Sequence, residues 1–468
     1  MTNQEKKGLN ISVKSFITAI LVILALMIVS YILTMVIPGG SYHRIEDSNG
    51  NMIIDTAAGF SEIEGGIPFG KWALSPILVL GATGNGTLIA VIIFLLVIGG
   101  VFNSLDKCGL MAYILSKTAN RFGAVRYKLM AIVVAFFMAL GSLIGSFEEC
   151  VPLVPLVCAL AISLGWDALT GVGMSLLAAG CGFAAGVCNP FTIGVAQELA
   201  NLPMFSGIWL RLVSFVLIYA LLILFLRIYA KKIERPIENG SSSINFTQNK
   251  KLDRGMICFI GILGAGIVII LSSALISSLQ DMTMIIVAVM FLAAGIVSTL
   301  VSGMTLKELL KTFWSGITSI FPAVLMILMA SSIKYTLEEA SVLDTILHWA
   351  VGLAETLPSW SVILFIYLIV LVMNFFIPSG SAKAFMLIPL IVPLASVFNI
   401  SPQLCVVAFA FGDGFSNVFY PTNPALLISL GLADVSYGDW FKWSVKFQIM
   451  NLILTSSILM LGLVVGYQ

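Results

Sequence analysis

Apolar runs alternate with short polar segments along most of this chain. The first run, at 16–37, supplies the roughly 20 apolar residues that a membrane-spanning helix needs. No small-residue cleavage site follows it, so we interpret it as a retained helix and not as a secretory signal. Further spans are expected within 75–104, 206–230, 255–279, 282–302 and 316–335. The pattern predicts an all-helical protein that crosses the membrane many times.

Polar residues interrupt the apolar sequence at matching places in the two halves of the chain. Two pairs of segments align at a constant offset of 234 residues: 145–165 with 379–399, and 186–193 with 420–427. Pro155 and Pro389 keep this offset, and so do Asn189 and Asn423. A repeat with broken apolar segments at corresponding positions is typical of secondary transporters.

The interruptions predict two re-entrant hairpins and two broken helices. In the first hairpin, the leg from Cys150 to Leu164 is about 22 Å long as a helix. An apolar bilayer core is about 30 Å thick, so the hairpin tip should stop inside the membrane. The predicted units are a first inverted repeat (1–232, with hairpin 127–164 and broken helix 167–200), a cytoplasmic linker (233–254), a connecting helix (255–281) and a second inverted repeat (282–468, with hairpin 359–398 and broken helix 402–430).

Charges along the chain predict its orientation. Three basic clusters should face the cytoplasm: Lys6, Lys7 and Lys14; Lys107, Lys117, Arg121, Arg126 and Lys128; Lys231, Lys232, Arg235, Lys250, Lys251 and Arg254. The acidic loop 38–75 should lie outside. The arm at 105–124 is basic and the corresponding arm at 336–357 is acidic, as expected for copies that face opposite sides. We predict nine crossings and two hairpins, with a cytoplasmic N-terminus and an extracytoplasmic C-terminus.

Composition supports a membrane protein and excludes several other classes. Residues are 59% hydrophobic and 10% charged, whereas soluble domains carry about 25% charged residues. The net charge of +1 gives no indication of nucleic-acid binding. The seven cysteines form no CxxC pair and the chain has only two histidines, so no metal site or other cofactor is expected. The sequence leaves open whether a proton or Na⁺ is a coupling ion for transport.

Acidic residues near the breaks are the sharpest chemical signal. Glu148 and Glu149 lie at the first hairpin tip, and Asp413 precedes the second break. An ionised carboxylate at the bilayer centre costs at least a few kcal/mol, so it should face a partner or a wet cavity. Lys383 is the one nearby base, which leaves an excess of acid that suits a cationic substrate. The alternative is a structural ion pair between Glu149 and Lys383.

Uncharged polar residues at the same breaks complete the predicted substrate site. They are Ser146, Asn189, Thr192, Ser379, Ser381, Thr422 and Asn423. Each broken helix also frees backbone groups, and each half-helix start contributes a positive dipole end. Outside the site, Arg211, Lys442 and Lys446 are expected to extend to a membrane interface, with Trp209 and Trp443 as interfacial anchors.

These strings resemble one known family. GSFEECVPLVPL, the CNPF break, PSGSAKAFMLIPLIVPL and FGDGFSNVFYPTNPALL are similar to the YfcC-like branch of the four-carbon dicarboxylate anaerobic carrier family, in the ion transporter superfamily. The resemblance covers nearly the whole chain and implies a homodimer with a scaffold and a mobile transport region that moves like an elevator. Branch members are described as basic amino-acid exchangers, while relatives carry dicarboxylates. Dicarboxylate members place Ser-Asn-Thr at the hairpin tips. The hairpin tips of this chain have a different sequence.

The residues and the resemblance together predict an antiporter of basic amino acids in a bacterial inner membrane, exchanging arginine for ornithine. The acids would face the substrate side chain, and the polar residues would hold its α-amino and α-carboxylate groups. One alternative is a proton- or Na⁺-coupled carrier of dicarboxylates or other small carboxylates. A channel is a second alternative. A membrane enzyme is the weakest, because no nucleophile–base or metal constellation is visible.

Overall fold

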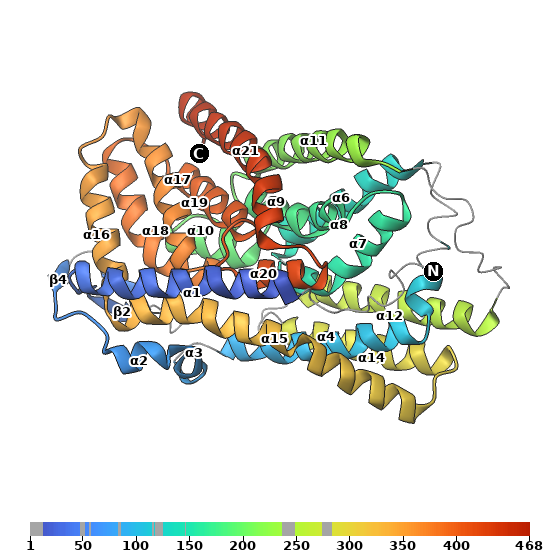
Figure 1. The fold of residues 1–468 in the computed structure, drawn as a ribbon. Coiled ribbons are helices and arrows are strands. Elements are labelled where there is room, and N and C mark those ends of the chain that lie inside the picture. Colours follow the sequence, from blue (N-terminus) through green and yellow to red (C-terminus); the bar gives the residue numbers. More distant parts are fainter. Residues whose placement is uncertain are drawn as a thin grey trace.

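The computed structural model describes residues 13–46, 52–55, 58–82, 86–114, 117, 125–145, 147–235, 249–273 and 283–468. Within these ranges, eight helices are long and apolar enough to cross a membrane. The chain is therefore an all-helical, multi-pass membrane protein. Its helices form two parts that meet along α15 (Leu306–Glu339), a long helix in the lower half of Figure 1.

The first part is a layer of long helices that run side by side. Besides α15 it contains α1 (Val13–Val36), α4 (Gly86–Lys107), α12 (Lys250–Ser273) and α14 (Thr283–Val301). The helix α4 packs on both α14 and α15, and α12 packs on α14. Buried aromatic rings from three of these helices, Phe94, Phe102, Phe259 and Phe291, form the core of this long-helix layer.

Glycines let α4 and α15 approach closely. A Cβ atom at Gly316 would lie 2.2 Å from the Gly99 carbonyl oxygen, and one at Gly100 would lie 2.5 Å from the Phe313 ring. Small residues at such crossings allow backbone contact between membrane helices. The two helices therefore form a tightly packed pair, on which the second part of the molecule lies.

The second part contains the hairpins and broken helices. The hairpins are α6 (Arg126–Ile144) with η3 (Glu148–Leu153) and α7 (Val154–Ser163), and α17 (Ser359–Phe376) with α18 (Gly380–Val397). The first broken helix comprises α8 (Ala168–Val172), η4 (Gly173–Leu177), α9 (Ala178–Ala185), η5 (Pro190–Gly194) and α10 (Val195–Leu199). The second comprises α19 (Pro402–Asn417) and α20 (Pro424–Leu432), and α11 (Ile208–Ile233) and α21 (Tyr437–Val465) flank the bundle.

The two broken helices cross at residues that are related by the repeat. A Cβ atom at Gly180 would lie 2.4 Å from Val418, and one at Gly414 would lie 2.3 Å from Ala184. Gly180 and Gly414 differ by 234 in the numbering, and so do Ala184 and Val418. Each contact between α9 and α19 is therefore the counterpart of the other, as a two-fold relation between the halves requires.

Short strands and helices cover one end of the molecule, which we call the strand end (Figure 1). There β1 (Gly40–Tyr42) pairs antiparallel with β4 (Phe60–Glu62), and β2 (Arg44–Glu46) with β3 (Met52–Ile54). The helices α2 (Phe69–Ala73), α3 (Ser75–Leu78) and α16 (Val342–Ala354) and the turn η1 (Val79–Gly81) complete it. The hairpin leg α7 and the first turn of α12 lie toward the opposite end, the linker end.

Polar contacts tie the strands to α16. Arg44 donates to Asp344 Oδ1 at 2.8 Å, and the backbone N–H of Tyr42 donates to Asp344 Oδ2 at 3.0 Å. The Tyr42 hydroxyl lies 3.1 Å from His348 Nδ1. Burial, followed by the negative charge of Asp344, raises the pKa of Tyr42 to about 12. The strand layer is thus held by a partly buried ion pair and its hydrogen bonds.

The structure corrects several expectations about single segments. The span predicted at 316–335 is the middle of α15, which continues to Glu339, so residues 336–339 are not part of the following arm. The helix α12 begins at Lys250, within the segment predicted as a linker, and residues 236–248 and 274–282 lie outside the described ranges. Most of the predicted arm 105–124 beyond residue 114 is outside them too, as is the N-terminus.

Arg211 and Trp443 were expected at a membrane interface, and both are buried instead. Arg211 has no exposed surface, and its guanidinium donates to the Phe205 carbonyl oxygen at 3.0 Å. Trp443 is 8% exposed and packs against Phe225 and Tyr229 of α11. Packing of α11 against its neighbours covers both side chains, whereas Trp209 is 46% exposed as an interfacial residue would be.

Candidate functional site

The first hairpin tip turns on a glycine. Gly145 adopts a left-handed conformation (φ 76°) that ends α6, a conformation that residues with a Cβ rarely adopt. After the tip, Glu148 begins a 3₁₀ turn that leads into α7. The Glu148 side chain is partly buried. Ser146 and the side chain of Glu149 lie outside the described part of the structure.

The first break lies directly against this hairpin. Gly186, at φ 49°, ends α9, and the following backbone turns toward α6. There the Ser142 hydroxyl accepts a hydrogen bond from the backbone N–H of Val187 at 3.0 Å. The Ser142 backbone carbonyl oxygen accepts one from the backbone N–H of Cys188, also at 3.0 Å. The break thus obtains from α6 the hydrogen bonds that a continuous helix would supply, as backbone at membrane depth requires. Asn189 accepts from the backbone N–H of Thr192 at 3.3 Å.

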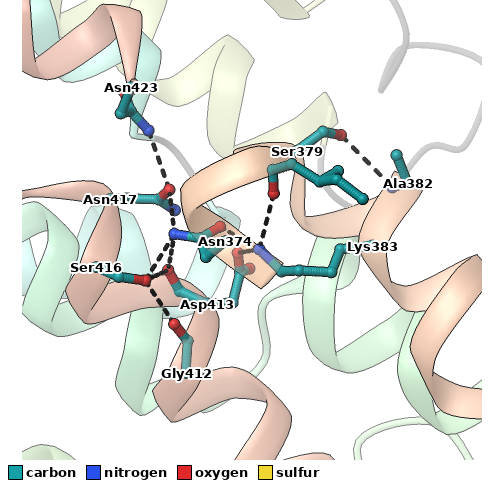
Figure 2. Close-up of polar contacts among 10 residues, drawn as sticks. Asn374, Ser379, Ala382, Lys383, Gly412, Asp413, Ser416, Asn417 and Asn423 are labelled. Carbon is teal, nitrogen blue, oxygen red and sulfur yellow. Dashed lines mark hydrogen bonds and ion pairs between the residues drawn. The ribbon is translucent and has the colours of Figure 1, made fainter. Parts of the chain in front are cut away.

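The second hairpin contains a buried ion pair. Lys383 and Asp413 have no exposed surface, and their Nζ and Oδ1 atoms are 2.7 Å apart. Lys383 also donates to the Ile377 carbonyl oxygen at 3.1 Å and to the Asn374 side chain (Figure 2). These three acceptors match the three N–H donors of a lysine ammonium. The structure therefore pairs Lys383 with Asp413 and leaves it no donor for a substrate.

Side-chain amides extend this pair to the second break. Asn374 donates to Ser416 Oγ at 2.6 Å and to Asn417 Oδ1 at 3.0 Å, and Asn423 donates to the same Asn417 oxygen at 3.0 Å (Figure 2). Asn423 in turn caps α20 by accepting from the backbone N–H of Ala425 at 2.9 Å. We call the set Lys383, Asp413, Asn374, Asn417 and Asn423 the amide network. It joins α17, α18, α19 and α20 into one polar core.

A cavity of about 140 Å³, the site cavity, opens between the long-helix layer and the broken elements. Its walls include Glu148 from the first tip, Ser379 from the second and Thr422 from the second break. The helix α15 contributes Lys334 and Glu338, which form an ion pair at 3.3 Å. The remaining lining residues are Val79, Leu88, Ala330, Ser331, Ile333, Tyr335, Phe376, Pro378, Pro424 and Ala425.

The structure brings only part of the predicted site together. Glu148, Ser379 and Thr422 share the site cavity. Asp413 and Asn423 belong to the amide network behind it, and Ser381 lies in the first turn of α18, partly exposed. Two others, Asn189 and Thr192, are fully buried. Thr192 lies close to Gly380 and Asp413, because a Cβ atom at Gly380 would be 2.7 Å from the Thr192 methyl carbon and 2.6 Å from Asp413 Oδ2.

These positions change the charge balance inferred from the sequence. Asp413 was expected to face the substrate, but its charge is offset by Lys383 in a buried pair. Among the described residues, the charges that line the site cavity are those of Glu148, Lys334 and Glu338, a net charge of −1.

Sequence reasoning missed Lys334 and Glu338 as site residues, and it missed Asn374 and Asn417. Glu338 was assigned to an arm outside the membrane core, because the end of α15 was placed too early. Asn374 had a usable signal, since it is a polar residue in an otherwise apolar span, and such residues mark functional positions. The four-residue spacing of Lys334 and Glu338 on one helix face was a second usable signal.

Next to the site cavity is a larger one at the strand end. It measures about 440 Å³, and we call it the outer cavity. Arg44 and Asp344 line it, together with Phe385 of α18. Glu338 lines both cavities, so the two are adjacent at this carboxylate.

Comparisons with known proteins agree with the family resemblance. The family described as C4-dicarboxylate anaerobic carrier, DcuC, matches residues 16–464. The chain is 29% identical over 412 residues to YfcC of Escherichia coli (strain K12), which is named as a candidate basic amino acid antiporter; the match covers 82% of this chain and 79% of YfcC. An uncharacterized protein of Haemophilus influenzae is 26% identical over 403 residues, covering 80% of this chain and 76% of its own.

Two solved structures are also similar to this chain. The YdaH transporter of Alcanivorax borkumensis is 18% identical with a TM-score of 0.44, covering 97% of this chain and 99% of its own. MtrF of Neisseria gonorrhoeae, described with a class of antimetabolite efflux pumps, is 17% identical with a TM-score of 0.43 and covers 94% of both chains.

The family match extends over most of the chain, from the first helix to the last, and confirms the family predicted from the hairpin and break motifs. This is a family of transporters and not of enzymes. The chain belongs to the C4-dicarboxylate anaerobic carrier family and is a multi-pass membrane protein that acts as a secondary transporter.

Proposed function

We propose that this transporter exchanges basic amino acids, with arginine and ornithine as its substrate pair. The single observation that carries the proposal is the set of charges in the site cavity: two carboxylates, Glu148 and Glu338, and one ammonium, Lys334. A basic amino acid at neutral pH carries an α-carboxylate, an α-ammonium and a side-chain cation. Each charge of the substrate thus has one opposite charge in the cavity.

The roles of the three residues follow from their positions. Lys334 and Glu338 are one turn apart on α15 and already form an ion pair, so they offer a cation and an anion side by side to the amino-acid head group. Glu148 comes from the hairpin tip, a different element, and would bind the guanidinium or ammonium of the side chain. Hydrogen bonds between ionised groups are among the strongest in proteins.

A dicarboxylate fits this charge set poorly. It carries two negative charges, and among the described residues of the site cavity only Lys334 is positive. Binding would place a dianion near Glu148 and Glu338 as well. Like charges at such distances raise the free energy of the complex. The charge set therefore favours an amino acid with a cationic side chain.

Ser379 and Thr422 complete the proposed site, one at each break of the second half. The other predicted polar residues would act indirectly. Asn423 belongs to the amide network, Thr192 is buried beside the α18 start, and the buried Asn189 accepts from the backbone N–H of Thr192. They would hold the tips in place. Ser146, Ser381 and Glu149 remain proposed site residues on the sequence pattern alone.

Transport would follow an elevator-type movement of the broken elements against the long-helix layer. The site cavity lies between these two parts, and the outer cavity extends it toward the strand end. We further propose a homodimer in a bacterial inner membrane, with the strand end extracytoplasmic and the linker end cytoplasmic. Exchange needs no external energy if the empty carrier moves slowly.

The test is uptake of labelled arginine into liposomes that contain ornithine. Glu148→Gln and Glu338→Gln should each raise the KM for arginine, because a hydrogen bond to a charged group contributes about 1.5–3 kcal/mol, or roughly 10- to 150-fold in affinity. Glu355→Gln, an exposed carboxylate at the end of α16, is the matched control and should transport as wild type. Normal arginine uptake by both cavity variants, or competition by succinate but not by ornithine, would overturn the proposal.

A further inference from the structure

A groove of about 350 Å³ runs between α11 and α21, on the side of the molecule opposite α15 (Figure 1). It is separate from the site cavity and shares no lining residue with it. Four apolar side chains of α11 form one wall, and α21 forms the other. The lining residues are Leu221, Leu224, Phe225, Ile228, Tyr229, Lys232, Trp443, Lys446 and Met450.

The apolar wall of the groove is open to the surroundings of the protein. Leu224 is 57% exposed and Ile228 is 54% exposed, although both belong to a helix that is long enough to span a bilayer. In a membrane, such side chains contact lipid acyl chains. The groove is therefore a depression in the lipid-facing surface.

The charged groups that line the groove all have the same sign. Lys232 and Lys446 line it, and no acidic residue does among the described residues. Neither lysine has an ion-pair partner in the part of the chain that the structure describes. Asp167, which contacts Tyr229 of the groove, accepts from the hydroxyls of Tyr229 and Thr170 at 2.6 and 2.8 Å.

Trp443 lines the groove about one turn before Lys446 on α21. The indole N–H of Trp443 has no acceptor within the described residues, although Trp443 is only 8% exposed. Buried polar groups normally have a hydrogen-bond partner, and each exception calls for an explanation. The indole nitrogen is covered by the protein, so Trp443 contributes its ring to the groove, next to Lys446.

The direction of the helices places Lys232 at headgroup depth. Leu210 lies near Gly462, and Tyr229 packs on Trp443, so α11 and α21 are antiparallel. With 26 residues, α11 is about 39 Å long, which exceeds an apolar core of about 30 Å, and Lys232 lies in its last turn. From Lys232 to Leu221 the groove extends about 16 Å toward the bilayer centre.

We propose that this groove binds an anionic phospholipid. The phosphate lies between Lys232 and Lys446, and one acyl chain follows Leu224 and Ile228 into the bilayer. Charge complementarity favours an anionic over a zwitterionic lipid, because two unpaired cations meet the headgroup. Basic pockets between membrane helices bind anionic headgroups in this way.

Fluorescence quenching tests the proposal on the full-length protein in detergent. The probes are phosphatidylglycerol and phosphatidylcholine that carry the same brominated acyl chain, which quenches tryptophan on contact. Brominated phosphatidylglycerol should quench saturably, and the Trp443→Phe variant should lose that saturable component. Phosphatidylcholine should need at least a tenfold higher concentration for the same effect.

Charge variants provide the second arm. The double variant Lys232→Gln/Lys446→Gln should bind phosphatidylglycerol about 30-fold more weakly, since each lysine near an anionic surface contributes about fivefold. Lys442→Gln is the matched control: it is an exposed lysine one turn earlier on α21 that does not line the groove. Both lysines of the groove are exposed, so the double variant should fold normally.

Three results would overturn the proposal. One is equal quenching by both lipids, and another is a double variant that titrates like wild type. The third is the absence of saturable quenching by either lipid, which would indicate that a second copy of the chain or another protein covers the groove.

Discussion

Removal of one partner of the Lys383–Asp413 pair should destabilise the protein strongly, while removal of both should not. The two groups are 2.7 Å apart and fully buried. At an effective dielectric constant of about 20, their Coulomb attraction is about 6 kcal/mol, of which a large part offsets the cost of desolvation. Breaking a buried pair by removing one partner typically costs about 3–5 kcal/mol, because the remaining charge is left uncompensated.

The perturbation is a double-mutant cycle of Lys383→Met and Asp413→Asn, which change charge with little change in shape. We expect each single variant to lose about 3–5 kcal/mol of stability and the double variant to be more stable than either single variant. Equilibrium unfolding in mixed micelles with increasing SDS, followed by circular dichroism, measures these differences. Glu355→Gln serves as a control for loss of an exposed charge.

The cycle separates a structural role of the pair from a role in binding. If the two losses simply add, Lys383 and Asp413 do not interact, and the reasoning from their distance and burial is refuted. If the double variant is stable and still transports arginine, the pair serves to hold α18 against α19 and not to bind substrate.

Three further outcomes follow from the packing. Gly182→Ala should reduce the yield of folded protein, because a Cβ atom there would lie 2.0 Å from the Met138 carbonyl oxygen. Gly261→Ala is the control and should leave the yield unchanged, because the space around Gly261 is open. Size-exclusion chromatography compares the two variants, and equal profiles would contradict the α6–α9 contact. The Arg211→Met variant should unfold at a temperature no lower than wild type, since two guanidinium nitrogens of Arg211 have no partner among the described residues. A large fall in Tm would show that an ionic partner exists. Asp344→Ala should cost about 1–3 kcal/mol and speed tryptic cleavage of the strand layer, because one buried and one partly buried hydrogen bond lose their acceptor. Unchanged cleavage would contradict this role.

Much of the fold could be predicted because each break in a helix requires particular residue types at nearby positions in the sequence. Gly145 and Gly186 adopt left-handed conformations that end helices, so glycine at these positions reports a backbone requirement. Proline and asparagine at the breaks behave alike: Asn423 caps α20, with Pro424 at its first position. These requirements act over a few residues, and the repeat shows them twice.

The site was harder to predict because it depends on how helices rotate against one another. Glu148, Ser379 and Thr422 were found by their place at the breaks, and they share one cavity. Lys334 and Glu338 come from α15, which contains no break at that point. Their four-residue spacing marks one face of a helix, but it does not show that this face meets the hairpin tips. Only packing of α15 against the hairpin tips brings these charges to the cavity.

The sequence by itself determined that the chain is a membrane transporter whose polar interruptions recur at a constant offset, because these features can be read without any knowledge of contacts. Tertiary structure decided which charges meet. Lys383 is the repeat counterpart of Glu149, yet it pairs with Asp413 on another helix. Arg211, expected at an interface, is covered by its neighbours. A buried charge takes the partner that the packing of helices brings within hydrogen-bond distance, and the sequence does not record that distance.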